Sequence, residues 1–305
     1  MGTRGCLWGN NRYYIFEIMP NKIIDIIKER IEQNNIDATF LNAFFDEHLR
    51  APIYMPIVLT TEAHIIRMRK NKNDLFNNVS DVTYPPADYS RNDRANLQGD
   101  PMFYGVLIDS PTDIPDIMSS ILESSPGIFN LDNFGEGIVT ESTWAINENF
   151  YLYALPVKEG FNIHPLSQII YEKWNEKKHK FPHEDVKIIE YMGELMSQKG
   201  DETIYKVTAC FVKHILSTHP DLKGIIYPSV QSQGEGICVA INPNVVDDMM
   251  QCIKTQMLYY SKQDEKSAEV RTVAISSVGD NGFFHWKYKE GWSEGMVKEI
   301  ISRNN

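Results

Sequence analysis

The chain has 305 residues, of which 42% are hydrophobic and 23% are charged, and its formal net charge at pH 7 is −11. This length and ordinary balance indicate one large globular domain, with or without appendages, and exclude a disordered or fibrous chain. The acidic balance argues against a nucleic-acid partner held through its phosphates, because such proteins present a positively charged face.

Cysteine usage and hydropathy exclude further classes of protein. The four cysteines, Cys6, Cys210, Cys238 and Cys252, are widely scattered and form no Cys-x-x-Cys pair, so we expect neither a zinc site nor a disulfide framework. No apolar run approaches the roughly 18 residues that span a bilayer, and no basic region followed by an apolar stretch opens the chain. We therefore expect a cytoplasmic protein with no membrane partner.

The N-terminal region predicts a helical hairpin. Isoleucines recur at helical spacing after Pro20, phenylalanines recur over residues 38–49, and Asn34-Asn35 forms the turn between the two runs. This pair has too much apolar surface to stand alone, so we expect it to pack on the main domain. The alternative is packing on another subunit, which would make the pair an element of a homo-oligomer.

Two short apolar runs of strand length follow, over residues 53–59 and 65–68. The second contains Arg67 and continues into Arg69 and Lys70. Because the side chains of a strand alternate between its two faces, Arg67 and Arg69 would face the same side and could reach one anionic ligand. A solvated basic sheet edge is the alternative for either arginine.

The segment from residue 84 to residue 123 carries a set of chemically active side chains. Tyr84-Pro85-Pro86 must be extended and leads to a turn that presents Arg94. A strand over 102–108 carries Tyr104, and a helix over 113–124 carries Glu123 beside its apolar face. An arginine, a phenol and a carboxylate at one place suit an anionic substrate whose reacting carbon becomes positive, as in cleavage of a nucleotide glycosidic bond.

The rest of the chain predicts mixed helices and strands. We expect strands over 144–156, 224–230 and 237–241, and helices over 163–176, 185–198, 204–214 and 247–260. A terminal hairpin of strands over 270–276 and 283–288 follows. His179 and His183 are four residues apart, but Pro182 between them disfavours a helical metal site, so we expect no metal.

The order and spacing of these residues resemble the signature of the RES domain, a family of NAD-consuming toxins named for its Arg, Glu and Ser. The matching positions are Arg94, Asn96, Gly99, Phe103, Tyr104 and Glu123. Residues 224–229, which include Tyr227 and Ser229, resemble the segment that carries the family's serine. The resemblance does not cover residues 1 to about 60 or the C-terminal tail.

The resemblance implies an α+β fold whose mixed core is similar to that of ADP-ribosyltransferases. It divides the chain into a helical N-terminal extension (1–58), a RES domain (59–250) and a C-terminal helix and hairpin (251–305). It also implies catalytic residues and residues that bind substrate. The catalytic set is Arg94, Tyr104 and Glu123, and the binding set is Arg67, Arg69, Asn96, Tyr227 and Ser229.

The activity that the resemblance implies is cleavage of the nicotinamide–ribose bond of NAD by a bacterial toxin or defence effector, restrained by an antitoxin or immunity protein. NAD is then a substrate and not a cofactor, since neither a Walker sequence nor a Rossmann fingerprint occurs. The acceptor could be phosphate as a co-substrate, water or a protein side chain, the last making the chain a protein ADP-ribosyltransferase. A catalytically silent nucleotide-binding module is the rival from another class.

Two site assignments have alternatives. Glu141 competes with Glu123 for the role of the carboxylate, although the segment around Trp144 resembles the strand that follows the catalytic helix in relatives. Ser229 could cap its own turn at a strand end instead of binding a phosphate or ribose oxygen.

Overall fold

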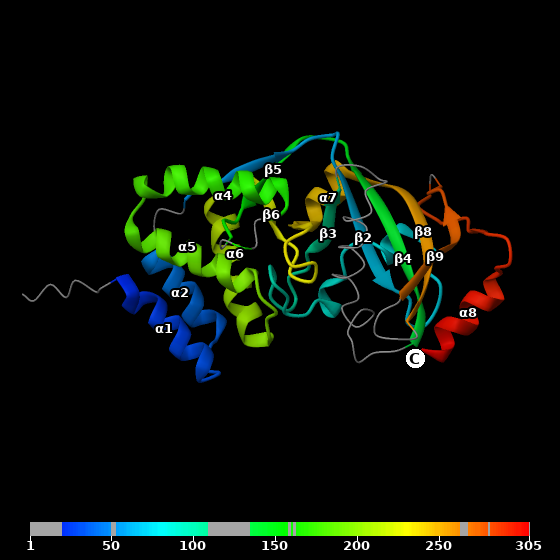
Figure 1. Ribbon diagram of the computed structural model, residues 1–305, viewed down its shortest axis with the longest axis horizontal. Helices are drawn as coiled ribbons and strands as arrows, with labels where there is room; N and C mark the ends of the chain where they lie inside the picture. Colours follow the sequence, from blue (N-terminus) through cyan, green and yellow to red (C-terminus); the bar gives the residue numbers. More distant parts are fainter. Residues whose placement is uncertain are drawn as a thin grey trace, which may run out of the picture.

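A computed structural model describes residues 20–49, 53–108, 135–157, 160, 163–262, 268–279 and 281–304 (Figure 1). Its strands form one ten-stranded sheet in the order β1-β5-β6-β7-β3-β2-β4-β8-β9-β10. The strands are β1 Pro56–Leu59, β2 His64–Lys70, β3 Phe103–Ile108, β4 Gly135–Ile146, β5 Phe150–Ala154, β6 Leu222–Pro228, β7 Ile237–Ile241, β8 Met250–Lys262, β9 Ala268–Ser276 and β10 Lys287–Tyr288.

Helices complete a mixed α and β architecture, which confirms the α+β class. The α-helices are α1 Pro20–Glu32, α2 Ala38–His48, α4 Pro165–Lys177, α5 His183–Met196, α6 Glu202–Thr218, α7 Pro243–Met249 and α8 Glu294–Arg303. The short 3₁₀ helices are η1 Val79–Asp81, η2 Ala87–Tyr89 and η3 Lys178–Lys180. The division into a core domain and two extensions stays a prediction.

The sheet opens in its middle, between β2 and β3. These strands pair only over residues 64–66 of β2, whereas β2 pairs with β4 along residues 64–70. The first residues of β3 instead continue beside β7. The sheet therefore has two halves, β1-β5-β6-β7-β3 and β2-β4-β8-β9-β10, which diverge beyond Ile66.

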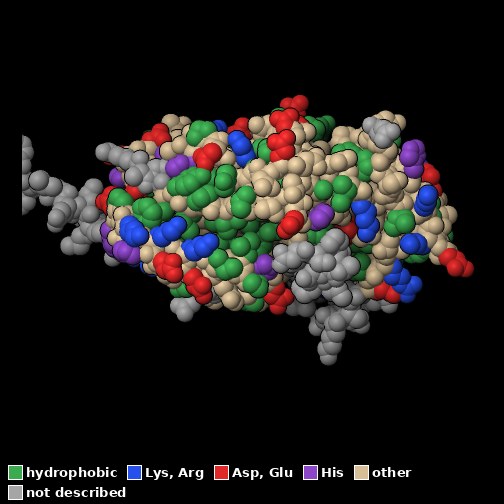
Figure 2. Space-filling view, turned by 90° about the horizontal axis from the view of Figure 1, so that it is seen from above, with side chains coloured by type: hydrophobic (Ala, Val, Ile, Leu, Met, Phe, Trp, Pro, Cys, Tyr) green, Lys and Arg blue, Asp and Glu red, His purple; other side chains and the backbone are tan. Residues whose placement is uncertain are grey.

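The helices α1, α2, α4, α5 and α6 gather at one end of the molecule (Figure 1). The predicted N-terminal hairpin packs there on its own chain, because the ring of Phe45 lies 5.8 Å from that of Phe211 in α6 and both rings are buried in the main core. Asp37 fixes the start of α2 by accepting a hydrogen bond from the backbone N–H of Phe40. Seen from above, hydrophobic side chains with lysines and arginines beside them gather on this half of the surface (Figure 2).

The opposite end is closed by α8, which the sequence analysis did not predict. Ser293 caps this helix by accepting a hydrogen bond from the N–H of Met296, and Val297 and Ile301 are buried. They belong to an apolar cluster with strand residues of the second half of the sheet: Ile138, Met257, Val273 and Ala274. An N-cap serine followed by apolar residues at helical spacing was the available signal.

The helix predicted over 247–260 is wrong, because α7 ends at Met249 and residues 250–262 form β8. A bulge conceals the strand pattern: Thr143 and Trp144 of β4 pair with Lys254 and Cys252, so Ile253 is skipped. Burial alternates on both sides of the skipped residue but changes phase there. The single strand predicted over 144–156 is also wrong, since β4 ends at Ile146 and β5 begins at Phe150.

Several other predicted elements are confirmed. The strands over 65–68, 102–108, 224–230 and 237–241 correspond to β2, β3, β6 and β7, and the helices over 163–176, 185–198 and 204–214 correspond to α4, α5 and α6. The helix predicted over 113–124 lies outside the described residues.

Candidate functional site

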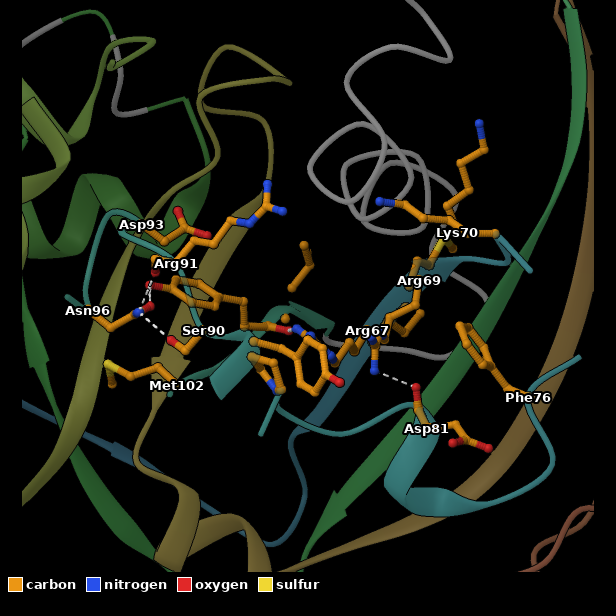
Figure 3. Close-up of a pocket in the computed structure, with 18 of the residues that line it drawn as sticks. Arg67, Arg69, Lys70, Phe76, Asp81, Ser90, Arg91, Asp93, Asn96 and Met102 are labelled. Carbon is orange, nitrogen blue, oxygen red and sulfur yellow. Dashed lines mark hydrogen bonds between the residues drawn. The ribbon is translucent and has the colours of Figure 1, made fainter. Parts of the chain in front are cut away.

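A cavity of about 870 Å³ is lined by both strands that diverge at the centre of the sheet. Its walls come from the end of β2, the beginning of β3, Tyr227 of β6, Cys238 of β7 and the loops over 72–76 and 85–96. Figure 3 shows how these side chains surround the opening. The volume lies in the range of small-molecule and cofactor sites.

The cavity is cationic although the chain is acidic. Its lining contains six cationic side chains, Arg67, Arg69, Lys70, Lys72, Arg91 and Arg94, and three acidic ones, Asp74, Asp81 and Asp93. A concave surface that concentrates positive charge on a molecule of net charge −11 attracts anions to that place. This arrangement favours an anionic ligand.

Arg67 bridges the opening between the diverging strands. Its Nη1 donates to the carbonyl of Tyr104 in β3 at 2.6 Å, and its Nε donates to the carbonyl of Thr83 at 3.2 Å. Burial and the neighbouring Arg69 lower the pKa of Arg67 to about 10, so the guanidinium is still charged at neutral pH. These two bonds use two of the five N–H donors of an arginine, and the half-buried group can also serve a ligand.

Arg69 faces the same side as Arg67, as the alternation of β2 predicts. The two residues pair with Thr140 and Ser142 of β4, and both line the cavity. Arg69 Nη1 donates to the carbonyl of Asp81 at 2.6 Å, and its guanidinium lies 5.3 Å from the centre of the Phe76 ring. Burial lowers the pKa of Arg69 and Asp81 opposes that shift.

Tyr104 and Asn96 are bonded to each other, and together they fix the Arg94 turn. The Tyr104 hydroxyl donates to Asn96 Oδ1 at 2.6 Å and accepts from the Ala95 N–H at 3.0 Å. Asn96 Nδ2 donates to Ser90 Oγ at 3.0 Å. Burial, followed by Asp93, raises the pKa of Tyr104 well above its ordinary value, so the phenol stays protonated and keeps this bond.

The guanidinium of Arg94 lies against α5. Its Nη1 donates to the carbonyls of Met196 and Gln198 at 3.0 and 2.9 Å, and the group lies 5.4 Å from the centre of the Tyr205 ring. Carbonyls at the C-terminus of a helix lack intrahelical partners, and Arg94, which is 5% exposed, satisfies them. The residue thus anchors the turn over 93–96 to α5, and its contact with a substrate stays a prediction.

Of the two residues predicted to bind substrate from β6 and the turn after it, Tyr227 lines the cavity and Ser229 does not. Tyr227 is buried and lines the cavity from β6. The hydroxyl of the buried Ser229 accepts a hydrogen bond from the N–H of Ser232 at 3.1 Å. This is the capped turn that was the alternative to substrate binding, and Ser229 is not among the described residues that line the cavity.

Of the two candidate carboxylates, Glu123 lies outside the described residues. Glu141 stands on β4 between Met68 of β2 and Gln256 of β8, on the face of the sheet opposite Arg67 and Arg69. It is not among the described residues that line the cavity. It is 3% exposed, and its Oε1 accepts from Gln256 Nε2 at 2.7 Å. Oε2 is buried without a hydrogen-bond partner in the described part of the chain. Burial raises the pKa of Glu141, whereas the Gln256 bond and Lys254 oppose the shift.

Sequence reasoning missed part of the lining. Phe76, Lys72, Tyr89 and Arg91 line the cavity, and Arg91 and Lys70 extend on either side of it in Figure 3. The available signals were a second arginine three residues before Arg94 and a second lysine two residues after Lys70, which ends the arginine-bearing strand β2. The aromatic residues carried none, because only the folded chain brings Phe76 beside β2.

Comparisons with known proteins add no assignment. No model of a known protein family matches the chain, and no curated protein matches it. The resemblance to the RES family therefore stays a prediction that rests on the residues named above. Within the described ranges, no three His, Cys, Asp or Glu side chains gather as metal ligands would, and no helix has the length and apolar character to cross a membrane.

Proposed function

We propose that the chain binds NAD in the cavity between β2 and β3 and cleaves its nicotinamide–ribose bond. The observation that carries the proposal is the cationic cavity of about 870 Å³ in an acidic chain. The diphosphate of NAD is anionic, and arginine binds phosphate oxygens through two parallel hydrogen bonds. The resemblance to NAD-consuming RES toxins supports the same substrate.

Three cationic groups suit the diphosphate. Arg67 lies between Arg91 and Lys70, which extend from opposite sides (Figure 3). A diphosphate that spans this interval meets the fork of Arg67 at its centre and a second cation on each flank. Positioning the dinucleotide in this way supplies much of the catalysis that a good leaving group needs.

The bond that breaks joins C1′ of the ribose to the pyridinium nitrogen. Its electron pair moves to that nitrogen and neutralises the ring, so no general acid is needed. Positive charge is left on the ribose, and a carboxylate beside it stabilises this charge. Glu123 is the carboxylate that the sequence predicts. Glu141, the alternative, pairs with Met68 and so faces the side of the sheet opposite Arg67 and Arg69.

The acceptor then forms a new bond to C1′. Phosphate yields a 1-phosphorylated ADP-ribose, and water yields ADP-ribose with release of a proton. A protein side chain as acceptor would make the chain a protein ADP-ribosyltransferase with the same first step. Consumption of NAD suits a bacterial toxin or defence effector, and restraint by an antitoxin or immunity protein follows from the family resemblance.

A second candidate function is a nucleotide-binding module without turnover. One observation favours it: Arg94, Tyr104 and Ser229, which the resemblance places in the substrate site, use polar atoms within the chain. A module of this kind keeps the cationic cavity and binds NAD or ADP-ribose unchanged.

Proton NMR of the purified protein with NAD, with and without phosphate, tests the proposal. We expect free nicotinamide from the wild type and a large loss in Arg67→Ala. Arg271→Ala is the matched control, since that exposed arginine pairs with Glu269 on β9. Comparing Glu123→Gln with Glu141→Gln identifies the carboxylate, and dependence on phosphate separates phosphorolysis from hydrolysis. Saturable NAD binding without nicotinamide release establishes the binding module, and absence of binding overturns both candidates.

A further inference from the structure

One wall of the cavity presents an aromatic ring with a guanidinium over it. The guanidinium of Arg69 lies 5.3 Å from the centre of the Phe76 ring, and both residues line the cavity. Figure 3 places this pair at the end opposite the turn that carries Asp93 and Asn96. Aromatic rings and guanidinium planes are the surfaces on which nucleobases stack.

This wall is held in place by a segment far away in the sequence. Trp286 Nε1 donates to the carbonyl of Phe76 at 2.9 Å. The backbone N–H of Phe284 donates to the carbonyl of the next residue, Asn77, at 2.8 Å. On the other side, Thr140 Oγ1 donates at 2.8 Å to Oδ1 of the buried Asn71. The backbone that carries the Phe76 ring is thus held before any ligand arrives, and preorganisation lowers the entropy lost on binding.

The charges at this end decide which base it suits. The three cations Arg69, Lys70 and Lys72 outnumber the two carboxylates of Asp74 and Asp81, whose oxygens accept hydrogen bonds from backbone N–H groups of residues 75, 77 and 78. The nicotinamide ring of NAD is a cation and adenine is neutral. Cations beside Phe76 repel the pyridinium and attract the phosphates next to the adenosine.

We propose that Arg69 and Phe76 form a stacking subsite for the adenine base of the dinucleotide, with Trp286 as the residue that positions it. This inference rests on the proposed function, since it assigns the two ends of NAD within the same cavity. The nicotinamide ribose then lies toward Tyr104 and Tyr227.

Isothermal titration calorimetry with ADP and with inorganic pyrophosphate tests the subsite without turnover. In the wild type we expect ADP to bind more tightly than pyrophosphate. Phe76→Ala should weaken ADP binding roughly 5- to 150-fold, the range of one base–aromatic stack, and leave pyrophosphate binding unchanged. Phe76→Tyr, which keeps a ring, should restore ADP binding.

The matched control is Phe40→Ala. This residue forms a second arginine–phenylalanine pair, with the Arg30 guanidinium 3.7 Å from the ring centre, on the N-terminal hairpin. It should leave ADP binding unchanged, and thermal unfolding of both variants checks that they fold. Equal weakening of ADP and pyrophosphate by Phe76→Ala, or no weakening of either, overturns the subsite.

Turnover separates this inference from the proposed function. Phe76→Ala should raise the KM for NAD and leave unchanged the KM for nicotinamide mononucleotide, which lacks adenosine. Trp286→Phe, which removes the N–H donor and replaces the indole with a smaller ring, should raise the KM for NAD less than Phe76→Ala does and leave kcat unchanged. If the wild type binds ADP through Phe76 but releases no nicotinamide, the proposed activity fails and the subsite stands. If it releases nicotinamide and Phe76→Ala keeps the wild-type KM, the subsite alone fails.

Discussion

The end of β2 and the turn over 93–96 both bring an arginine to the cavity, but they use it differently. Arg67 reaches across the opening of the sheet with one bond from each of two nitrogens. The guanidinium of Arg94 lies against the end of α5, where one nitrogen serves two carbonyls. A residue type that suits phosphate can therefore build the wall of a site, and its surroundings show which task it performs.

The largest expected effect follows from removing the anchor. Arg94→Ala leaves two carbonyls at the end of α5 without their donor and opens a space beside Tyr205, so we expect a loss of about 2–4 kcal/mol in the free energy of unfolding. Urea denaturation measures this loss. Unchanged stability together with complete loss of nicotinamide release would instead show that Arg94 contacts the ligand, as Arg67 is proposed to do.

Substitution of Arg67 on β2 should affect ligand binding more than stability, the reverse of the result expected for Arg94. Arg67→Ala removes the central cation of the cavity, and we expect pyrophosphate to bind roughly 10- to 100-fold more weakly. The unfolding free energy should change less than in Arg94→Ala, because Arg67 is only half-buried. Calorimetric titration and urea denaturation of the two variants provide the two readings. A larger stability loss in Arg67→Ala than in Arg94→Ala would contradict this order.

Glu141 extends the comparison to an acid. Because its pKa is raised from 4.5, the folded chain holds this proton more tightly than the unfolded chain does. That contribution to stability is present below the ordinary pKa and is lost as the pH rises through the raised value. Glu141→Gln, which has no such proton, should therefore be more stable than the wild type near pH 7, with a difference that shrinks on acidification. A stability difference that does not change with pH would show that the pKa of the Glu141 carboxyl is not raised.

The smallest effect is expected at the rim. Arg91 is exposed and Lys70 is half-exposed, so neutralising either should weaken pyrophosphate binding only about 2- to 5-fold, since solvent screens such charges. Titrations at two salt concentrations should show a weaker salt dependence in Lys70→Ala than in the wild type. If Lys70→Ala and the wild type showed the same salt dependence, Lys70 would not contribute to pyrophosphate binding.

Much of the fold follows from local patterns, and the exceptions have identifiable causes. Period-two alternation predicted that Arg67 and Arg69 share a side, and helical spacing predicted α5 and α6. The strand β8 was missed because the bulge at Ile253 breaks its alternation. The roles of the site residues depend on contacts between distant segments, which no local pattern contains. Arg94, for example, bonds to Met196 and Gln198, which lie 102 and 104 positions further along the chain. The hydrogen bond from Tyr104 to Asn96 was not predicted either.

The bond from Trp286 to Phe76 also sets an order of events during synthesis. It joins residues 210 positions apart, and chains begin to fold from the N-terminal side while they are being made. The strand β2 and the turn over 93–96 leave the ribosome long before Trp286 does. The Phe76 wall is thus the last part of the cavity to be completed, and a nascent chain that stops before residue 286 lacks the support of this wall.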